Sequence, residues 1–210
     1  NQYFEDIIFA NPKLIQFKPD LVYFHTSYVN ITQFPNLNQS AEDTESLLTE
    51  ELRRYNSLWN KCFELFNCPI IQNNFDFPPH RSAGNLDAVL NQGRIRYINQ
   101  LNLFFTEAAS QNSNLHIQDI NYLSAYLGIE KWWDTTFYHT YKYAQSFNSI
   151  PHLAHNLSNI ISSLFGKQKK CLIVDLDNTM WGGIIGEIGQ EGIEIGPGTA
   201  TGEAYLELQK

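Results

Sequence analysis

Cysteine is scarce in this sequence, and basic residues are outnumbered by acidic ones. The 210 residues include only Cys62, Cys68 and Cys171, without a CxxC pair. An odd number of cysteines at this spacing argues against a disulfide framework or a zinc site. Such cysteine usage fits a reducing, cytoplasmic location. Lys and Arg total 14 against 22 Asp and Glu, giving a formal net charge of −8. We therefore expect no nucleic-acid partner, because non-specific binding to nucleic acid depends on a basic surface.

Long apolar runs are also missing. No stretch reaches the ~18 residues that a membrane-spanning helix needs, so we expect no membrane partner. The chain is nevertheless 43% hydrophobic and 14% aromatic, which is enough for a packed core and argues against disorder. It begins at Asn1 without Met and ends at Lys210 inside an expected helix from Glu203. We read it as a piece of a longer protein.

Short strand patterns alternate with long helical patterns along the chain. We expect strands at residues 20–24, 69–72, 115–117 and 171–174, and helices at residues 40–66, 86–109, 119–127 and 152–165. This alternation is typical of parallel βαβ units, so the predicted fold class is α/β. The polar linker Gly166–Lys170 suggests a three-layer parallel-sheet domain over residues 1–166. Residues 167–210 would begin a second α/β domain.

Local signals support the first two long helices. Ser40 followed by Asp43 is an acidic variant of the capping box. Apolar residues then recur at helical spacing and predict one buried face on each helix. They are Leu48, Leu52, Tyr55, Trp59, Cys62 and Phe66 in the first helix, and Tyr97, Leu101, Phe104, Phe105 and Ala108 in the second. Residues 130–150 are aromatic and are expected to be irregular.

Two aspartates follow the last apolar run, Cys171–Val174. In an open α/β sheet, ligands bind beyond the carboxyl ends of the strands, so Asp175 and Asp177 are expected at a ligand site. One carboxylate can attack phosphorus as a nucleophile, and the other can give and take protons. Their oxygens also suit Mg²⁺, which binds one or two carboxylates together with substrate phosphate. An isolated Asp-x-Asp is often only a turn, which is the alternative interpretation.

The surrounding residues make the pattern more specific. The string Asp175-Leu176-Asp177-Asn178-Thr179 resembles the first motif of the haloacid-dehalogenase-like (HAD) phosphatases. The segments Met180–Glu187 and Gly192–Gly196 extend the likeness to the FkbH-like group, phosphatase subfamily IIIC. The resemblance implies a HAD-like Rossmannoid domain with Asp175 as nucleophile and Asp177 as general acid/base. Both would hold Mg²⁺, and Asn178 and Thr179 would support the loop.

The resemblance also implies a function. Proteins of this group move a glyceryl unit from a phosphorylated three-carbon donor onto an acyl carrier protein, with dephosphorylation, as in polyketide biosynthesis. Simple phosphatase activity on a phosphorylated small molecule remains an alternative. The family's later motifs, a Ser or Thr, a Lys and a distal acidic pair, are expected beyond Lys210. We therefore expect residues 1–210 alone to be inactive.

Residues before the linker resemble the family's N-terminal region, which is similar to the SGNH-hydrolase and flavodoxin-like folds. The likeness is carried by Gln72–Phe75, Pro78-Pro79, Gly84–Asp87, Trp133-Asp134 and Lys142. Asp134 and His139 roughly correspond to the Asp and His of SGNH esterases, but they lie five positions apart instead of three. The alternative is a non-catalytic domain that docks a carrier protein or a glycan, and the spacing favours it.

Overall fold

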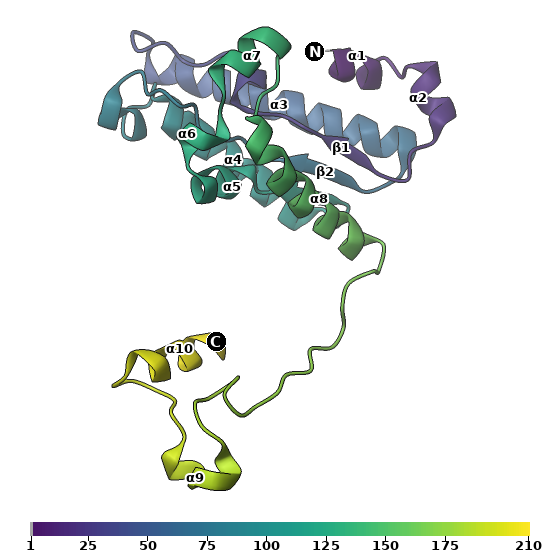
Figure 1. Cartoon of the computed structure of the whole chain (residues 1–210). Helices are drawn as coiled ribbons and strands as arrows, with labels where there is room; N and C mark the ends of the chain where they lie inside the picture. The colour runs from purple at the N-terminus through teal and green to yellow at the C-terminus, as the bar shows by residue number, and fades with distance from the viewer. Residues whose placement is uncertain (1) are drawn as a thin grey trace. The chain divides into compact units, whose positions relative to one another are not determined.

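The computed structural model describes residues 2–210, which form two compact units that divide between Ile161 and Ser162. Both units are drawn in Figure 1. The elements of the first unit are α1 (Gln2–Ile8), α2 (Pro12–Phe17), β1 (Val22–Phe24), η1 (Tyr28–Asn30), α3 (Ala41–Phe66), β2 (Ile70–Asn73), η2 (Gly84–Ala88), α4 (Arg94–Gln111), β3 (Leu115–Gln118), α5 (Ile120–Leu127), α6 (Ile129–Trp132), α7 (Thr135–Tyr141), η3 (Phe147–Ser149) and most of α8 (Ile150–Leu164), whose end from Ser162 onward falls in the second unit. The predicted α/β class is confirmed.

The three strands of this unit form a parallel sheet in the order β1-β2-β3. Val22 pairs with Ile70, and Ile70 pairs with Leu115. The long helices α3 and α4 supply the crossovers between consecutive parallel strands. Because all strands run the same way, the loops that follow them gather at one edge of the sheet.

One face of the sheet packs against α3 and α4. Ser40 caps α3 as predicted, since its Oγ accepts a hydrogen bond from Asp43 N and the Asp43 carboxylate accepts one from Ser40 N. The core contains the aromatic cluster of Tyr55, Trp59 and Phe105, whose ring centroids lie 4.8–5.9 Å apart. These three side chains are at most 2% exposed, which confirms the predicted buried faces of both helices.

The opposite face of the sheet is covered by α8 (Figure 1). Gln118, at the end of β3, donates from Nε2 to the backbone oxygen of Leu153 in α8 at 3.0 Å. Ile71 is fully buried and alternates with Ile70, which belongs to the core on the α3 and α4 face. The sheet therefore has helices on both faces, as the three-layer prediction required.

The helix expected over residues 86–109 is shorter and begins later. The structure has η2 at Gly84–Ala88 and α4 at Arg94–Gln111, separated by a short loop. Asp87 is fully buried, and its carboxylate accepts hydrogen bonds from Ala83 N and Ile95 N. A Cβ at Gly93 would lie 2.0 Å from the Asp87 carbonyl oxygen. These contacts hold the chain in a turn before α4.

The aromatic segment 130–150, expected to be irregular, contains short helices instead. Asp134 caps α7 by accepting a hydrogen bond from Phe137 N at 3.0 Å. Ser146 N donates to the Trp132 carbonyl oxygen at 2.7 Å, which closes the segment into a loop. Trp132 itself is 1% exposed. Packing around that indole orders a segment that lacks a clear periodic pattern.

The second unit contains α9 (Ile185–Gly192) and α10 (Ala200–Leu208). The prediction of a strand at Cys171–Val174 is wrong for this structure, because these residues form no strand. Leu172 and Ile173 are 84% and 91% exposed. A strand needs a neighbour to satisfy its backbone hydrogen bonds, and no strand of residues 162–210 is available to pair with it.

Two further features bear on the expectations from composition. Cys62, predicted to pack in the core, is 1% exposed there, and burial raises the pKa of its thiol to about 12.

Over residues 2–210, no helix has both the length and the apolar character that crossing a membrane requires.

Candidate functional site

The aspartate loop of the second unit is a tight turn built on its own backbone. Thr179 N and Met180 N both donate to the Leu176 carbonyl oxygen, at 3.2 and 2.8 Å. Asn178 adopts a left-handed conformation, with φ 55°. Its Oδ1 accepts a hydrogen bond from Gly183 N at 2.8 Å. Asn178 thus supports the loop, a role that the sequence assigned to Asn178 and Thr179 together.

Within this loop the two aspartates have different surroundings. Asp175 is exposed, and its Oδ1 accepts a hydrogen bond only from the adjacent Leu176 N, at 2.9 Å. Asp177 is half-buried, and its Oδ1 accepts from Trp181 Nε1 at 3.2 Å and from Ile185 N at 3.1 Å. The Asp175 carboxylate is therefore open to a ligand, whereas Asp177 is held in place by the glycine-rich segment.

That glycine-rich segment folds back along the loop. Gly182 and Glu194 exchange two backbone hydrogen bonds of 2.9 and 2.8 Å. Tyr205 of α10 donates from its hydroxyl to the Asn178 carbonyl oxygen at 3.3 Å, and Gln209 donates to the Met180 carbonyl oxygen at 2.6 Å. These hydrogen bonds connect the loop that contains Asp177 to Glu194 and to the C-terminal helix α10 with its cap Gln209.

The donor set of the loop suits Mg²⁺ in its chemistry. The carboxylates of Asp175 and Asp177 and the nearby backbone carbonyls are hard oxygen ligands, and Mg²⁺ commonly takes one or two carboxylates with the rest of its shell from water and phosphate. In the part of the chain that the structure describes, no group of three or more His, Cys, Asp or Glu side chains gathers as a ready-made metal site. The two aspartates would thus hold the ion jointly with a phosphorylated ligand.

Asp134 precedes α7 as its N-cap residue and His139 lies within α7, and the two side chains are not joined. The Asp134 carboxylate caps the helix, while His139 is an exposed residue whose ring contacts Tyr138 at 5.5 Å between centroids. Among residues 2–210 no hydrogen bond connects the two side chains. The helix cap explains an aspartate at position 134 without catalysis, and their catalytic pairing stays a prediction.

A buried polar network occupies the carboxyl ends of the strands in the first unit. Thr26, after β1, donates from its N to Asn73 Oδ1 at 2.8 Å, and the Asn73 amide returns a bond to the Thr26 carbonyl oxygen. Gln72 Nε2 donates to Thr26 Oγ1 at 2.9 Å, and Gln72 Oε1 accepts from Trp59 Nε1 at 3.2 Å. The network fastens the ends of β1 and β2 to each other and to α3.

A buried carboxylate, that of Asp76, lies in the loop that follows β2. It is fully buried, and it accepts hydrogen bonds from Tyr28 N at 2.9 Å and from Trp132 Nε1 at 2.7 Å. Burial raises the pKa of Asp76 to about 6, against the lowering effect of these hydrogen bonds. Asp76 thereby ties the loops after β1 and β2 to α6, and no sequence pattern pointed to it.

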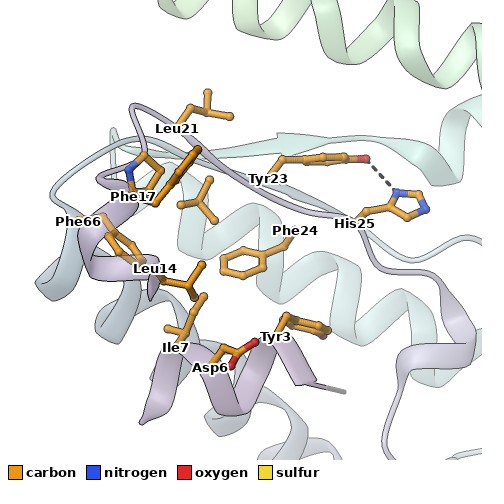
Figure 2. A pocket seen from close by; sticks show the side chains of 12 residues that line it. Tyr3, Asp6, Ile7, Leu14, Phe17, Leu21, Tyr23, Phe24, His25 and Phe66 are labelled. Atoms are coloured by element: carbon orange, nitrogen blue, oxygen red, sulfur yellow. Dashed lines mark hydrogen bonds between the residues drawn. The ribbon is translucent and has the colours of Figure 1, made fainter. Parts of the chain in front are cut away.

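An apolar cavity of about 430 Å³ lies beside β1 (Figure 2). Side chains of α1, α2 and β1 line it, among them Ile7, Leu14 and Phe24. At its polar end the Tyr23 hydroxyl lies 3.0 Å from His25 Nδ1, as the dashed line in Figure 2 shows. Sequence reasoning missed this cavity, because its walls come from four separate elements, α1, α2, β1 and the last residue of α3.

Comparison with known proteins places the chain in a family. Residues 1–162 match the family model described as FkbH, N-terminal domain. The chain belongs to the FkbH family. The match ends close to the division between the two compact units, whereas the sequence predicted the domain boundary in the linker Gly166–Lys170. The assignment of residues 167–210 to a HAD-like domain stays a prediction.

A solved structure agrees with the FkbH assignment. The crystal structure of the N-terminal part of the protein BF1531 from Bacteroides fragilis, described as containing a phosphatase domain and complexed with Mg, is similar with a TM-score of 0.84 and 25% sequence identity. The match covers 100% of this chain and 54% of that chain, so this chain spans about half the length of that neighbour. No curated protein matches the chain.

Proposed function

We propose that this FkbH-family chain belongs to a Mg²⁺-dependent, HAD-type enzyme that processes a phosphorylated small molecule. The observation that carries the proposal is the open Asp175 carboxylate beside a fixed Asp177, within the string Asp175–Thr179. The description of BF1531 as a protein with a phosphatase domain, complexed with Mg, supports it. The reducing cytoplasm is the proposed location, since Cys62 and Cys68 are free thiols.

Each aspartate has a chemical role that fits its surroundings. Asp175, whose carboxylate accepts a hydrogen bond only from Leu176 N, can attack phosphorus to form an aspartyl-phosphate and displace the substrate oxygen. Asp177, held by Trp181 Nε1 and Ile185 N through one oxygen, can give a proton to that leaving oxygen. It can later accept a proton from the water that attacks the aspartyl-phosphate, a step that releases phosphate and frees Asp175. Mg²⁺ bound by this loop would neutralise phosphate charge.

The finer proposal concerns the substrate. We propose glyceryl transfer from a phosphorylated three-carbon donor to an acyl carrier protein, with release of phosphate, as the resemblance to FkbH-like enzymes suggests. Hydrolysis of a small phosphate ester is the simpler form of the same chemistry. Both depend on Asp175 as nucleophile, so a single substitution tests them together.

The test is phosphate release by the whole protein in the presence of Mg²⁺, with p-nitrophenyl phosphate as the substrate. Asp175→Asn is expected to lower the rate by at least ~10³-fold, because the amide is a far weaker nucleophile. Asp20→Asn, a matched change at an exposed position outside the loop, should leave the rate unchanged. Turnover retained in Asp175→Asn would remove Asp175 as the nucleophile.

A second candidate function is docking of the acyl carrier protein by the first unit, without chemistry there. It is favoured by exposed aromatic side chains around α7, since Tyr141, Tyr143 and Phe147 are 54–67% exposed. Exposed aromatic residues in one segment are typical of interaction surfaces. Pull-down of a carrier protein should weaken in a Tyr141→Ala, Tyr143→Ala double variant, and an unchanged yield would argue against this surface. The esterase and glycan-docking alternatives have no comparable observation.

A further inference from the structure

The carboxylate of Asp177 is held through only one of its two oxygens. Its Oδ1 accepts hydrogen bonds from Trp181 Nε1 at 3.2 Å and from Ile185 N at 3.1 Å. Within residues 2–210, no hydrogen bond is made to Oδ2. Because both donors meet the same oxygen, they fix the orientation of the carboxylate, and Oδ2 is the oxygen that is left for a substrate.

The two donors also decide where a proton on Asp177 is carried. A backbone N–H and an indole N–H only donate, so the oxygen that faces both of them must accept. Oδ1 is therefore the unprotonated oxygen, and a proton on Asp177 belongs to Oδ2. Ile185 donates from the backbone at the start of α9, so Trp181 supplies the side-chain donor of the pair.

The indole of Trp181 is aimed by the backbone around it. Trp181 is half-buried, and its backbone forms a bridge with that of Asp177. The next residue, Gly182, exchanges two backbone hydrogen bonds with Glu194. A Cβ at Gly182 would lie 3.0 Å from the Glu194 Cβ and 3.2 Å from Tyr205 Cε2, so the chain is closely packed at this point. These contacts limit the directions in which the indole can point.

From this geometry we infer that Trp181 is a positioning residue for proton transfer by Asp177. The inference rests on the phosphoryl chemistry proposed above. In the first step the Asp175 carboxylate forms a bond to phosphorus, the bond from phosphorus to the leaving oxygen breaks, and the proton on Asp177 Oδ2 passes to that oxygen. Trp181 acts only through Asp177, because its hydrogen bond to Oδ1 keeps Oδ2 in one orientation. Loss of that bond frees the carboxylate to rotate and slows the transfer.

The test compares Trp181→Phe with the wild type on two phosphate esters, using the whole protein with Mg²⁺. p-Nitrophenolate leaves readily as an anion, whereas phenolate leaves far better when it is protonated, so phenyl phosphate depends more strongly on a general acid. The ratio kcat/KM reports the steps up to release of the phenol. Trp181→Phe removes the Nε1–H and keeps a large ring. It is expected to lower kcat/KM for phenyl phosphate at least about tenfold more than for p-nitrophenyl phosphate.

Two further variants separate the possible outcomes. Trp133→Phe is the matched control, because Trp133 is also half-buried and its indole nitrogen makes no hydrogen bond within residues 2–210. Both values of kcat/KM should stay at the wild-type level in that control. Equal losses on the two esters in Trp181→Phe would leave the ring a structural role alone and overturn the inference. If Asp175→Asn is inactive at the same time, the proposed function still stands, whereas turnover retained in Asp175→Asn would remove the proposed function itself.

A second measurement needs no turnover. The 210-residue chain has four tryptophans and should give four indole N–H signals in ¹H–¹⁵N NMR spectra. The signal that disappears in Trp181→Phe belongs to Trp181. Asp177→Ala removes the acceptor and should move this signal toward that of a solvated indole, whereas Asp175→Ala in the same loop should leave it in place. A Trp181 signal that stays unchanged in Asp177→Ala would show that the hydrogen bond is not formed, and the inference would fail.

Discussion

Replacement of Asp76 by Asn tests how much the buried carboxylate contributes to stability at the carboxyl ends of the strands. Asp76 is fully buried between Tyr28 N and Trp132 Nε1, and its pKa is raised to about 6 from 3.8. A folded-state pKa above the unfolded value means that the native protein binds the proton more tightly. The contribution of protonated Asp76 to the free energy of unfolding is therefore fully present below about pH 3.8, and it is lost as pH rises through about 6.

The size of the effect follows from that shift. Each pKa unit is worth ~1.4 kcal/mol, and the unfolded carboxyl is already partly ionised at pH 4, so ionisation of buried Asp76 lowers the free energy of unfolding by ~2.5 kcal/mol between pH 4 and pH 8. Asp76→Asn has no such titration. An Asn amide nitrogen cannot accept from Trp132 Nε1, so the variant also loses one hydrogen bond at every pH, at a cost of ~1 kcal/mol.

The assay is urea unfolding of both proteins from pH 4 to pH 8, followed by tryptophan fluorescence, to which the buried Trp59 and Trp132 of the first unit contribute. The variant should be less stable than the wild type at pH 4 and at least as stable at pH 8. Asp134→Asn is a matched control, because Asn also caps helices well and that side chain is not fully buried. A difference in the free energy of unfolding between wild type and Asp76→Asn that stays constant from pH 4 to pH 8 would refute the reasoning.

Three further substitutions test the packing and the turns of the first unit by urea unfolding. Ser40→Ala removes the cap of α3 and should cost ~1 kcal/mol, whereas Ser46→Ala inside the helix should cost less than half as much. Phe105→Ala in the aromatic core should cost ~3–5 kcal/mol; comparable loss in Leu103→Ala, which is 60% exposed, would contradict the assigned helix face. Gly93→Ala would place a Cβ 2.0 Å from the Asp87 carbonyl oxygen and should lower stability. A variant as stable as the wild type would disprove the tight turn before α4.

Features that depend on near neighbours in the chain were predictable. The capping box of Ser40 and Asp43 and the buried faces around Tyr55 and Leu101 follow from side-chain spacing on a single helix. The alternation of strands and helices predicted a parallel sheet, which the order β1-β2-β3 confirms. The string Asp175–Thr179 could be found because its members are adjacent.

Features that depend on distant pairs were not predictable. Asp76 accepts a hydrogen bond from Trp132, which lies 56 positions further along the chain, and His25 contacts Gln145 across 120 positions. No local sequence pattern predicts either contact. The strand expected at Cys171–Val174 shows the same limit, because a strand forms only with a neighbour to receive its hydrogen bonds.

By itself, then, the sequence determined which segments can be helical or extended, which faces are apolar, and where two aspartates stand together. Only the tertiary structure decided which buried polar groups find partners. The convergence of parallel strand ends brings together residues such as Asp76, Trp132 and Gln145, and removal of water there makes each of their hydrogen bonds matter.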